Sequence, residues 1–304
     1  MSYIKDIIIK YPIRRSRGQK QKFRDYVCNE ANTLKQDIKI ENLENKHDNI
    51  LIGDVDNAKV VFTAHYDTPA ASLFPNIMMP RNVVLGMIYQ FSYPILLALL
   101  SLGVSYLIAN LLNFQYEIWA VLYIVLYLGS FYLCTRCFDN KNNYNDNTSG
   151  VAAVLELARK CSRNDIAFIL FDNEEKGKLG SKAFSKAHNK SFIDKLVINL
   201  DCVGNGNNIL FVAKDKALDN PYYKSISNFV KNNEAYNVEF YGMKGSISNS
   251  DYKNFEGGVS VMACKKGRYV GYYTPRIHTK FDTIYSEENI EFIVGSFNQF
   301  IENI

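Results

Sequence analysis

The chain has 304 residues, of which 47% are hydrophobic, and its net charge is +4 at pH 7. This length and composition predict one large or two small globular domains with a sizeable core. Such a modest charge does not indicate a nucleic-acid partner, and the basic residues within 11–17 are expected to begin a solvated helix. The six cysteines lack the spacing of a disulfide framework and the N-terminal stretch does not resemble a secretory signal, so a reducing compartment is expected.

The first part of the chain predicts a surface helix and two strands. The helix is expected over residues 20–32, within a polar and charged region. Residues 49–55 and 59–64 are expected to form two strands joined by a turn at Asp56-Asn57. The second strand leads directly into His65-Tyr66-Asp67-Thr68, which places a histidine and a carboxylate at a strand end.

Residues 83–136 have a different character from the rest of the chain. No charged residue lies between Arg81 and Glu117, or between Glu117 and Arg136. A helix needs roughly 20 apolar residues to cross a bilayer, so the first segment is long enough and the second is marginal. Pro94 would kink the first helix without forbidding it. We therefore expect an inserted two-helix transmembrane hairpin, and the alternative is a pair of buried helices in a soluble protein.

The remainder of the chain alternates between strand and helix patterns. Strands are expected at residues 166–171, 196–200, 209–212 and 259–263, and helices at residues 151–161, 181–188, 220–232 and 287–304. This alternation predicts an α/β fold with a central mixed, largely parallel sheet flanked by helices. Residues 1–82 and 137–304 would form one discontinuous domain around the inserted hairpin.

Two adjacent carboxylates, Glu174 and Glu175, follow the strand expected at 166–171. Neighbouring acids repel each other unless cations offset their charge, and a metal centre can use one as a ligand and the other as a general base. A single acidic pair is usually a solvated turn, but further ligand-type side chains follow strands or open helices elsewhere: His65, Asp146, Asp201 and His278. Two imidazoles and three carboxylates without a thiolate suit zinc or another divalent hydrolytic metal.

The segments that carry these side chains resemble the co-catalytic di-zinc aminopeptidase family in their order, spacing and neighbours. They are His65-Tyr66-Asp67, Asn145-Asp146-Asn147-Thr148-Ser149-Gly150, Glu174-Glu175, Asn199-Leu200-Asp201 and Pro275-Arg276-Ile277-His278-Thr279. The family includes bacterial leucyl aminopeptidases, aminopeptidase S and glutamate carboxypeptidase II, with glutaminyl cyclases as relatives. The resemblance covers roughly residues 1–82 and 137–304.

The resemblance implies two zinc ions bridged by Asp146 and a role for each neighbouring residue. One zinc ion would be held by His65 and Asp201, and the other by Glu175 and His278. Glu174 would be the general base. Asp67 would hold His65 in one tautomer. A cis peptide bond between Asp146 and Asn147 is also implied.

The sequence departs from the family near Asp251. Ser250-Asp251 matches a family segment that lines the site. Some members carry a tyrosine four residues before the aspartate that matches Asp251, and this tyrosine hydrogen-bonds to the oxyanion. Here that position is Ile247, and Tyr272 or Tyr273 would have to replace this contact.

The expected function is that of a membrane-anchored zinc metalloaminopeptidase, which hydrolyses N-terminal residues from peptides with a metal-activated water and a glutamate base. The alternatives are a glutaminyl cyclase, a carboxypeptidase on the same scaffold and a non-catalytic binding protein. The expected partners are a peptide substrate and the lipid bilayer; the oligomeric state is left open.

The basic residues predict the orientation of the hairpin. Arg81, Arg136 and Lys141 flank its two domain-side ends, whereas the connection at residues 110–117 has no lysine or arginine. The positive-inside rule therefore places the catalytic domain on the cytoplasmic side of a bacterial cytoplasmic membrane. An active site so close to the bilayer would favour apolar or membrane-released peptides.

Overall fold

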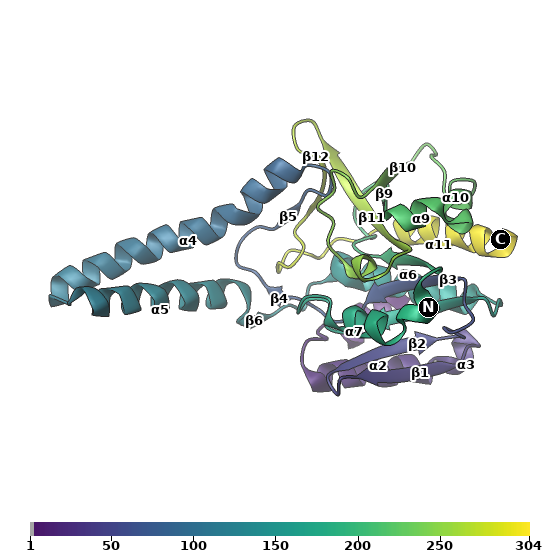
Figure 1. Ribbon diagram of the computed structural model, residues 1–304, viewed down its shortest axis with the longest axis horizontal. Helices are drawn as coiled ribbons and strands as arrows, with labels where there is room; N and C mark the ends of the chain where they lie inside the picture. The colour runs from purple at the N-terminus through teal and green to yellow at the C-terminus, as the bar shows by residue number, and fades with distance from the viewer. Residues whose placement is uncertain (1–2) are drawn as a thin grey trace.

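A computed structural model describes residues 3–304 as a domain built on a mixed β-sheet, from which a helical hairpin projects (Figure 1). The main sheet has the order β1-β2-β7-β3-β8-β11-β12-β5, with β9 paired to β11 and β10 paired to β9. These strands are β1 (Ile38–Leu43), β2 (His47–Ile52), β3 (Val60–His65), β5 (Ile77–Met78), β7 (Ile166–Phe171), β8 (Leu196–Leu200), β9 (Asn208–Ala213), β10 (Asn237–Gly242), β11 (Gly258–Gly267) and β12 (Gly271–Pro275).

The four central strands β7, β3, β8 and β11 run parallel, and antiparallel pairs lie on both sides of them. The predicted α/β class with a mixed sheet and a parallel centre is therefore confirmed. The predicted strands at 166–171, 196–200, 209–212 and 259–263 are also present, as β7, β8, β9 and part of β11.

Helices cover both faces of the sheet, and β7 shows why. Ile166, Phe168 and Leu170 face one hydrophobic cluster, and Ala167 and Ile169 face the other, as the two-residue repeat of a strand requires. The larger cluster includes residues of α1 (Tyr3–Lys10), α2 (Arg17–Asn29), α6 (Gly150–Lys160) and α11 (Glu287–Asn303). The smaller cluster includes residues of α7 (Leu179–Ala187) and α8 (Asn189–Phe192). The remaining short helices are α3 (Ala31–Leu34), α9 (Asp215–Asp219) and α10 (Pro221–Ile226).

Several predicted elements differ from the observed ones. The strands expected at 49–55 and 59–64 are present as β2 and β3, but they are not neighbours in the sheet, because β7 lies between them and pairs with both. The partner of β2 at the sheet edge is β1, whose mostly half-exposed residues gave no clear apolar pattern. The helix expected at 220–232 ends early, and only Pro221–Ile226 is helical.

The hairpin consists of α4 (Val83–Leu112) and α5 (Tyr116–Thr135), joined by a short turn. The two helices extend together away from the sheet, and they converge at their far end and diverge towards the domain (Figure 1). None of the twenty residues of α5, all of which the structure describes, is buried. Both helices are long and apolar enough to cross a membrane by length and composition. The transmembrane assignment itself stays a prediction.

Short strands fix both ends of the hairpin to the domain. β4 (Ala70–Ala71) pairs with β6 (Phe138–Asp139), and β5 pairs with β12. Because β4 follows His65 and β6 precedes Asp146, the chain leaves the sheet after β3 and returns to it before α6 across a single two-stranded ladder.

Candidate metal centre

The carboxyl ends of three neighbouring parallel strands bring most of the predicted ligands together. His65 ends β3 and lies opposite Phe171, the last residue of β7, which Glu174 and Glu175 follow. Asp201 comes directly after β8, the other neighbour of β3. Parallel strands end at the same edge of a sheet, where α/β proteins place their sites.

Asp146 reaches this edge from the distorted helical segment Tyr144–Ser149 that precedes α6. The predicted cis peptide bond between Asp146 and Asn147 is confirmed. The side chain of Asn147 donates to the carbonyl of Leu200 at 3.0 Å and accepts from the backbone N–H of Cys202 at 3.2 Å. These bonds hold the segment against the end of β8.

The two carboxylate oxygens of Asp146 face different imidazoles. Oδ1 lies 3.4 Å from Nε2 of His65, and Oδ2 lies 2.9 Å from Nε2 of His278. On the first side, Nε2 of His65 is also 3.8 Å from Oδ1 of Asp201. On the second side, Nε2 of His278 is 3.5 Å from Oε2 of Glu175.

The side chains therefore form two groups that share Asp146. In each group, ligand atoms lie within 4.8 Å of one another: His65 with Asp146 and Asp201, and Asp146 with Glu175 and His278. A third group of the same kind contains His65, Glu174 and Glu175, so Glu174 lies beside the ligand atoms. The predicted ligands thus lie together, and their individual roles stay predictions.

The buried carboxyl groups of Glu174 and Glu175 have raised pKa values, as expected where no cation balances their charge. Burial, opposed by His278, raises the pKa of Glu175 to about 8, and burial also raises the pKa of Glu174 well above its ordinary value. Burial lowers the pKa of His65 and His278, but the neighbouring carboxylates outweigh it and raise both. Oε1 of Glu175 is buried and has no hydrogen-bond partner among the described residues. A buried, unpaired carboxylate oxygen beside imidazole nitrogens fits a divalent cation such as Zn²⁺.

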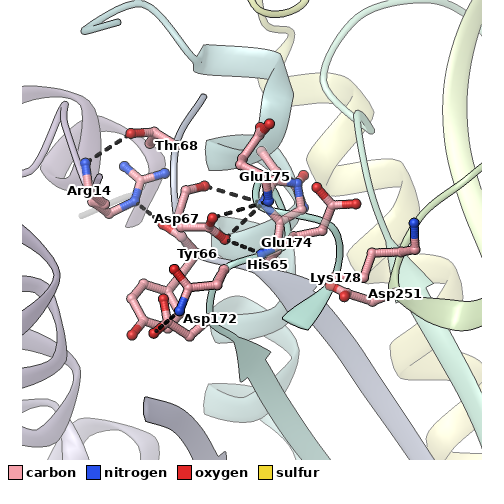
Figure 2. Close-up of polar contacts among 12 residues, drawn as sticks. Arg14, His65, Tyr66, Asp67, Thr68, Asp172, Glu174, Glu175, Lys178 and Asp251 are labelled. Carbon is pink, nitrogen blue, oxygen red and sulfur yellow. Dashed lines mark hydrogen bonds and ion pairs between the residues drawn. The ribbon is translucent and has the colours of Figure 1, made fainter. Parts of the chain in front are cut away.

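Asp67 orients the acidic pair more directly than it orients the histidine (Figure 2). Its carboxylate accepts hydrogen bonds from the backbone N–H groups of Glu174 at 2.9 Å and Glu175 at 3.2 Å. Nδ1 of His65 lies 3.2 Å from the carbonyl oxygen of Asp67 and 3.6 Å from its carboxylate. The main-chain carbonyl is therefore the nearer partner of the imidazole.

Arg14 is fully buried, which corrects the expectation that the basic stretch at 11–17 is wholly solvated. Its Nε donates to the carbonyl of Tyr66 at 2.5 Å, and its Nη2 donates to Oγ1 of Thr148 at 3.0 Å. Its backbone N–H donates to Oγ1 of Thr68 (Figure 2). Arg14 thereby ties the segment after His65 to the segment after Asp146.

Asp282 is a further residue that sequence reasoning did not select. Its carboxylate accepts from the backbone N–H groups of Asn145 at 3.2 Å and Asp146 at 3.0 Å. Burial raises the pKa of this carboxyl group to about 8. Its position four residues after His278 is the one signal that could have drawn attention to it.

The segment around Asp251 lies at the same site. Oδ1 of Asp251 accepts from Ser181, whereas Oδ2 is buried without a partner among the described residues, and burial raises the pKa to about 7. The hydroxyl of Tyr272, one candidate for the missing family tyrosine, is hydrogen-bonded to Glu239. The replacement of the family contact by Tyr272 or Tyr273 stays a prediction.

Residues 138–291 match the model of peptidase family M28. A vacuolar membrane protease from Lachancea thermotolerans is 31% identical over 127 residues, which cover 41% of this chain and 12% of that protein. The match thus spans only a small part of that relative.

Two solved structures show the same fold at low identity. A Zn-dependent exopeptidase from Parabacteroides distasonis superposes with a TM-score of 0.60 at 15% identity, covering 99% of this chain and 96% of that chain. A glutaminyl cyclase from Porphyromonas gingivalis superposes with a TM-score of 0.59 at 12% identity, covering 99% and 95%. The family match takes in Asp146, Glu174, Glu175, Asp201 and His278 and extends over just over half of the chain, which therefore belongs to peptidase family M28.

Proposed function

We propose that this protein is a membrane-anchored zinc aminopeptidase that hydrolyses N-terminal residues from peptides. The observation that carries the proposal is the position of Asp146, whose two oxygens face His65 and His278 on opposite sides. His65, Asp146 and Asp201 would hold one zinc ion, and Asp146, Glu175 and His278 the other. Zinc held there supplies Lewis acidity, which lowers the pKa of water and polarises a carbonyl group.

Glu174 is assigned the proton transfers. Glu174 is the member of the acidic pair that belongs to neither of the two groups sharing Asp146. One of its carboxylate oxygens nevertheless lies within 4.8 Å of a ring nitrogen of His65. Asp67 fixes its backbone N–H, so the carboxylate starts from a defined position. Glu174 would take a proton from the attacking water and pass it to the leaving amine, and such general acid–base catalysis contributes roughly 10²–10⁴-fold.

Negative charge beside the ligand groups favours a substrate with a free α-amine. Glu174 and Asp251 interact electrostatically with each other as well as with the metal-binding side chains. Burial raises the pKa of both carboxyl groups, and a protonated amine placed beside them would favour their ionised forms, an attraction that an N-acetylated peptide lacks. This argument supports an aminopeptidase rather than a carboxypeptidase.

A glutaminyl cyclase is the second candidate, because a glutaminyl cyclase shares the fold almost as closely as a zinc exopeptidase does. Such cyclases resemble this chain but use one zinc ion. The presence of both His65 and Asp201 beside Asp146 favours a second metal position and hence a peptidase.

Membrane anchoring is supported by the hairpin itself. The exposed large hydrophobic residues of the chain lie mostly on α4 and α5, and such surface is unfavourable in water. Beyond their base, which contacts the domain, the two helices project away from it (Figure 1). We propose that they cross the bilayer, with the peptidase domain on the cytoplasmic side.

The direct test is a peptide panel offered to the purified, membrane-reconstituted protein. A peptide with a free N-terminus should lose its first residue, its N-acetylated form should be inert, and amidation of its C-terminus should have no effect. Chelation should abolish the activity and added zinc should restore it. Cyclisation of an N-terminal glutaminyl peptide without hydrolysis of the others would favour the cyclase, and cleavage that requires a free C-terminus would favour a carboxypeptidase.

A further inference from the structure

A cavity of about 420 Å³ joins the candidate metal centre to the base of the hairpin. Glu175 and His278 line it at one end, and Tyr93 of α4 and Phe131 of α5 line it at the other. Its volume falls within the range of about 300–1,000 Å³ that is usual for ligand sites. The cavity therefore belongs both to the peptidase domain and to the inserted helices.

The packing of the hairpin explains why this space is open. Near the tip, α4 turns Ser101, Ser105 and Ala109 inward, all of them buried, and Nε1 of Trp119 donates to Oγ of Ser105 at 3.2 Å. Small residues four apart let two membrane helices approach closely. The helices therefore meet at the tip, and their divergence towards the domain is visible in Figure 1.

At the base, large aromatic rings take the place of these small residues. The ring of Tyr93 stacks between Phe74, with centroids 5.3 Å apart, and Phe131, with centroids 6.3 Å apart. Phe74 comes from the loop after β4, so the stack joins the peptidase domain to both helices. These rings form an apolar wall for the cavity, opposite the metal ligands.

The cavity thus changes in polarity along its length. At the metal end lie Glu175, His278 and Arg136, whose Nη1 donates to the carbonyl of Glu175 at 3.3 Å. At the hairpin end the lining is aromatic, and Phe91, which also lines it, lies on a helix whose outer surface is apolar. A ligand that fits has a polar reacting end and apolar side chains directed towards the bilayer.

We infer that the hairpin forms part of the substrate site, and that the preferred substrates are peptides with apolar side chains just beyond the scissile bond, in segments that partition into a membrane. This inference rests on the proposed peptidase function and specifies its substrate class. Burying one large apolar side chain against Tyr93 and Phe131 should raise kcat/KM by roughly tenfold or more.

The test uses the full-length protein in phosphatidylcholine vesicles and two peptides with the same free N-terminal leucine. One continues with leucine and phenylalanine, and the other with serine and glutamine; leucine amide serves as a substrate without a tail. The quantity measured is the ratio of kcat/KM for the apolar tail to kcat/KM for the polar tail. We expect a ratio of at least about ten for the unaltered protein.

Matched variants separate the cavity from simple partitioning into lipid. Tyr93→Ala and Phe131→Ala should lower the kcat/KM ratio towards the ratio of the two peptides' partition coefficients into the same vesicles. Tyr106→Ala and Tyr132→Ala, at exposed positions of the same two helices, should leave the kcat/KM ratio unchanged. A ratio near one in the unaltered protein would overturn the inference, even if a variant failed to fold. A high ratio that persists in both cavity variants would overturn it as well, because partitioning would then explain the preference. If leucine amide and both peptides are untouched, the proposed peptidase function fails and this inference fails with it.

Discussion

Oδ2 of Asp282 accepts a hydrogen bond from the backbone N–H of Asp146 at 3.0 Å. Its other oxygen accepts from the backbone N–H of Asn145, so one side chain holds two successive amides. Both residues lie in a distorted segment whose backbone is not regular helix. The orientation of the shared carboxylate of Asp146 therefore depends on a residue near the C-terminal end of the domain.

Asp282→Asn should weaken metal binding. Each carboxylate oxygen of Asp282 accepts from one backbone N–H group, whereas the side chain of asparagine has only one acceptor oxygen. Loss of a residue that orients a metal ligand typically costs about 10–100-fold in metal affinity or activity. The measurement is a zinc titration against a competing chelator. Asp194→Asn, at an exposed position, is the control and should bind zinc like the unaltered protein. Equal affinities for all three proteins would show that Asp282 does not position Asp146.

Arg14→Met should destabilise the whole domain. The substitution leaves the carbonyl of Tyr66 and the hydroxyl of Thr148 without their buried donor. Each buried unsatisfied group costs about 1–3 kcal/mol, so a loss of about 3 kcal/mol in the free energy of unfolding is expected. Denaturant unfolding measures it, with the exposed Arg17→Met as control. A change below about 0.5 kcal/mol, the usual effect of a surface substitution, would contradict the assigned role.

Metal removal should make the domain less stable, and increasingly so as the pH rises. Glu175 ionises near 4.3 in an unfolded chain but at a pKa of about 8 in the metal-free folded site. The folded state therefore holds this proton more tightly than the unfolded chain does. The proton's contribution to the free energy of unfolding is fully present below about pH 4.3 and is lost as the pH rises to about 8. The raised pKa of His278 acts in the same direction.

Thermal unfolding of chelated and zinc-loaded protein between pH 5.5 and 8 checks this expectation. Zinc binds deprotonated ligands, so the gap between the two melting temperatures should widen towards pH 8. With free zinc at about a hundred times its Kd, the stabilisation should reach about 2.7 kcal/mol. A gap that stays constant or narrows with rising pH would argue against zinc at these carboxylates.

The sequence predicted those parts of the molecule that local pattern determines. β7 is continuously apolar because both its faces are buried, and the metal-ligand candidates are recognisable because each follows a strand or opens a helix. The helix expected at 220–232 was too long: only Pro221–Ile226 is helical, and at the far end of the expected range Asn232 and Asn233 accept from the backbone N–H groups of Val238, Ala235 and Tyr236. Such local bonds compete with helical ones.

The unpredicted features depend on contacts between distant segments. The insertion of β7 between β2 and β3 joins segments separated by the whole hairpin. Arg14 and Thr148 are 134 residues apart, and Asp282 and Asp146 are 136 apart. An arginine in a basic stretch has the same local pattern whether it is exposed or buried, so its role could be found only from the fold.

The orientation of the hairpin can be tested by labelling intact cells with an impermeant thiol reagent, after the native cysteines have been replaced. A cysteine at Asn113, in the turn between α4 and α5, should label on intact cells. A cysteine at Lys141, on the domain side, should label only after lysis. The reverse pattern would place the domain outside the cell. Release of the protein by carbonate extraction, with neither position labelled on intact cells, would favour two helices that do not cross the membrane.

The central claim is that one glutamate of the acidic pair binds metal while its neighbour transfers protons. The decisive measurement is the metal content and turnover of Glu174→Gln, compared with Glu175→Gln and the unaltered protein. We expect Glu174→Gln to retain two zinc ions per chain and to lose at least about 10²-fold in kcat, whereas Glu175→Gln should lose metal. Near-normal turnover in Glu174→Gln, or loss of its zinc, would contradict the account.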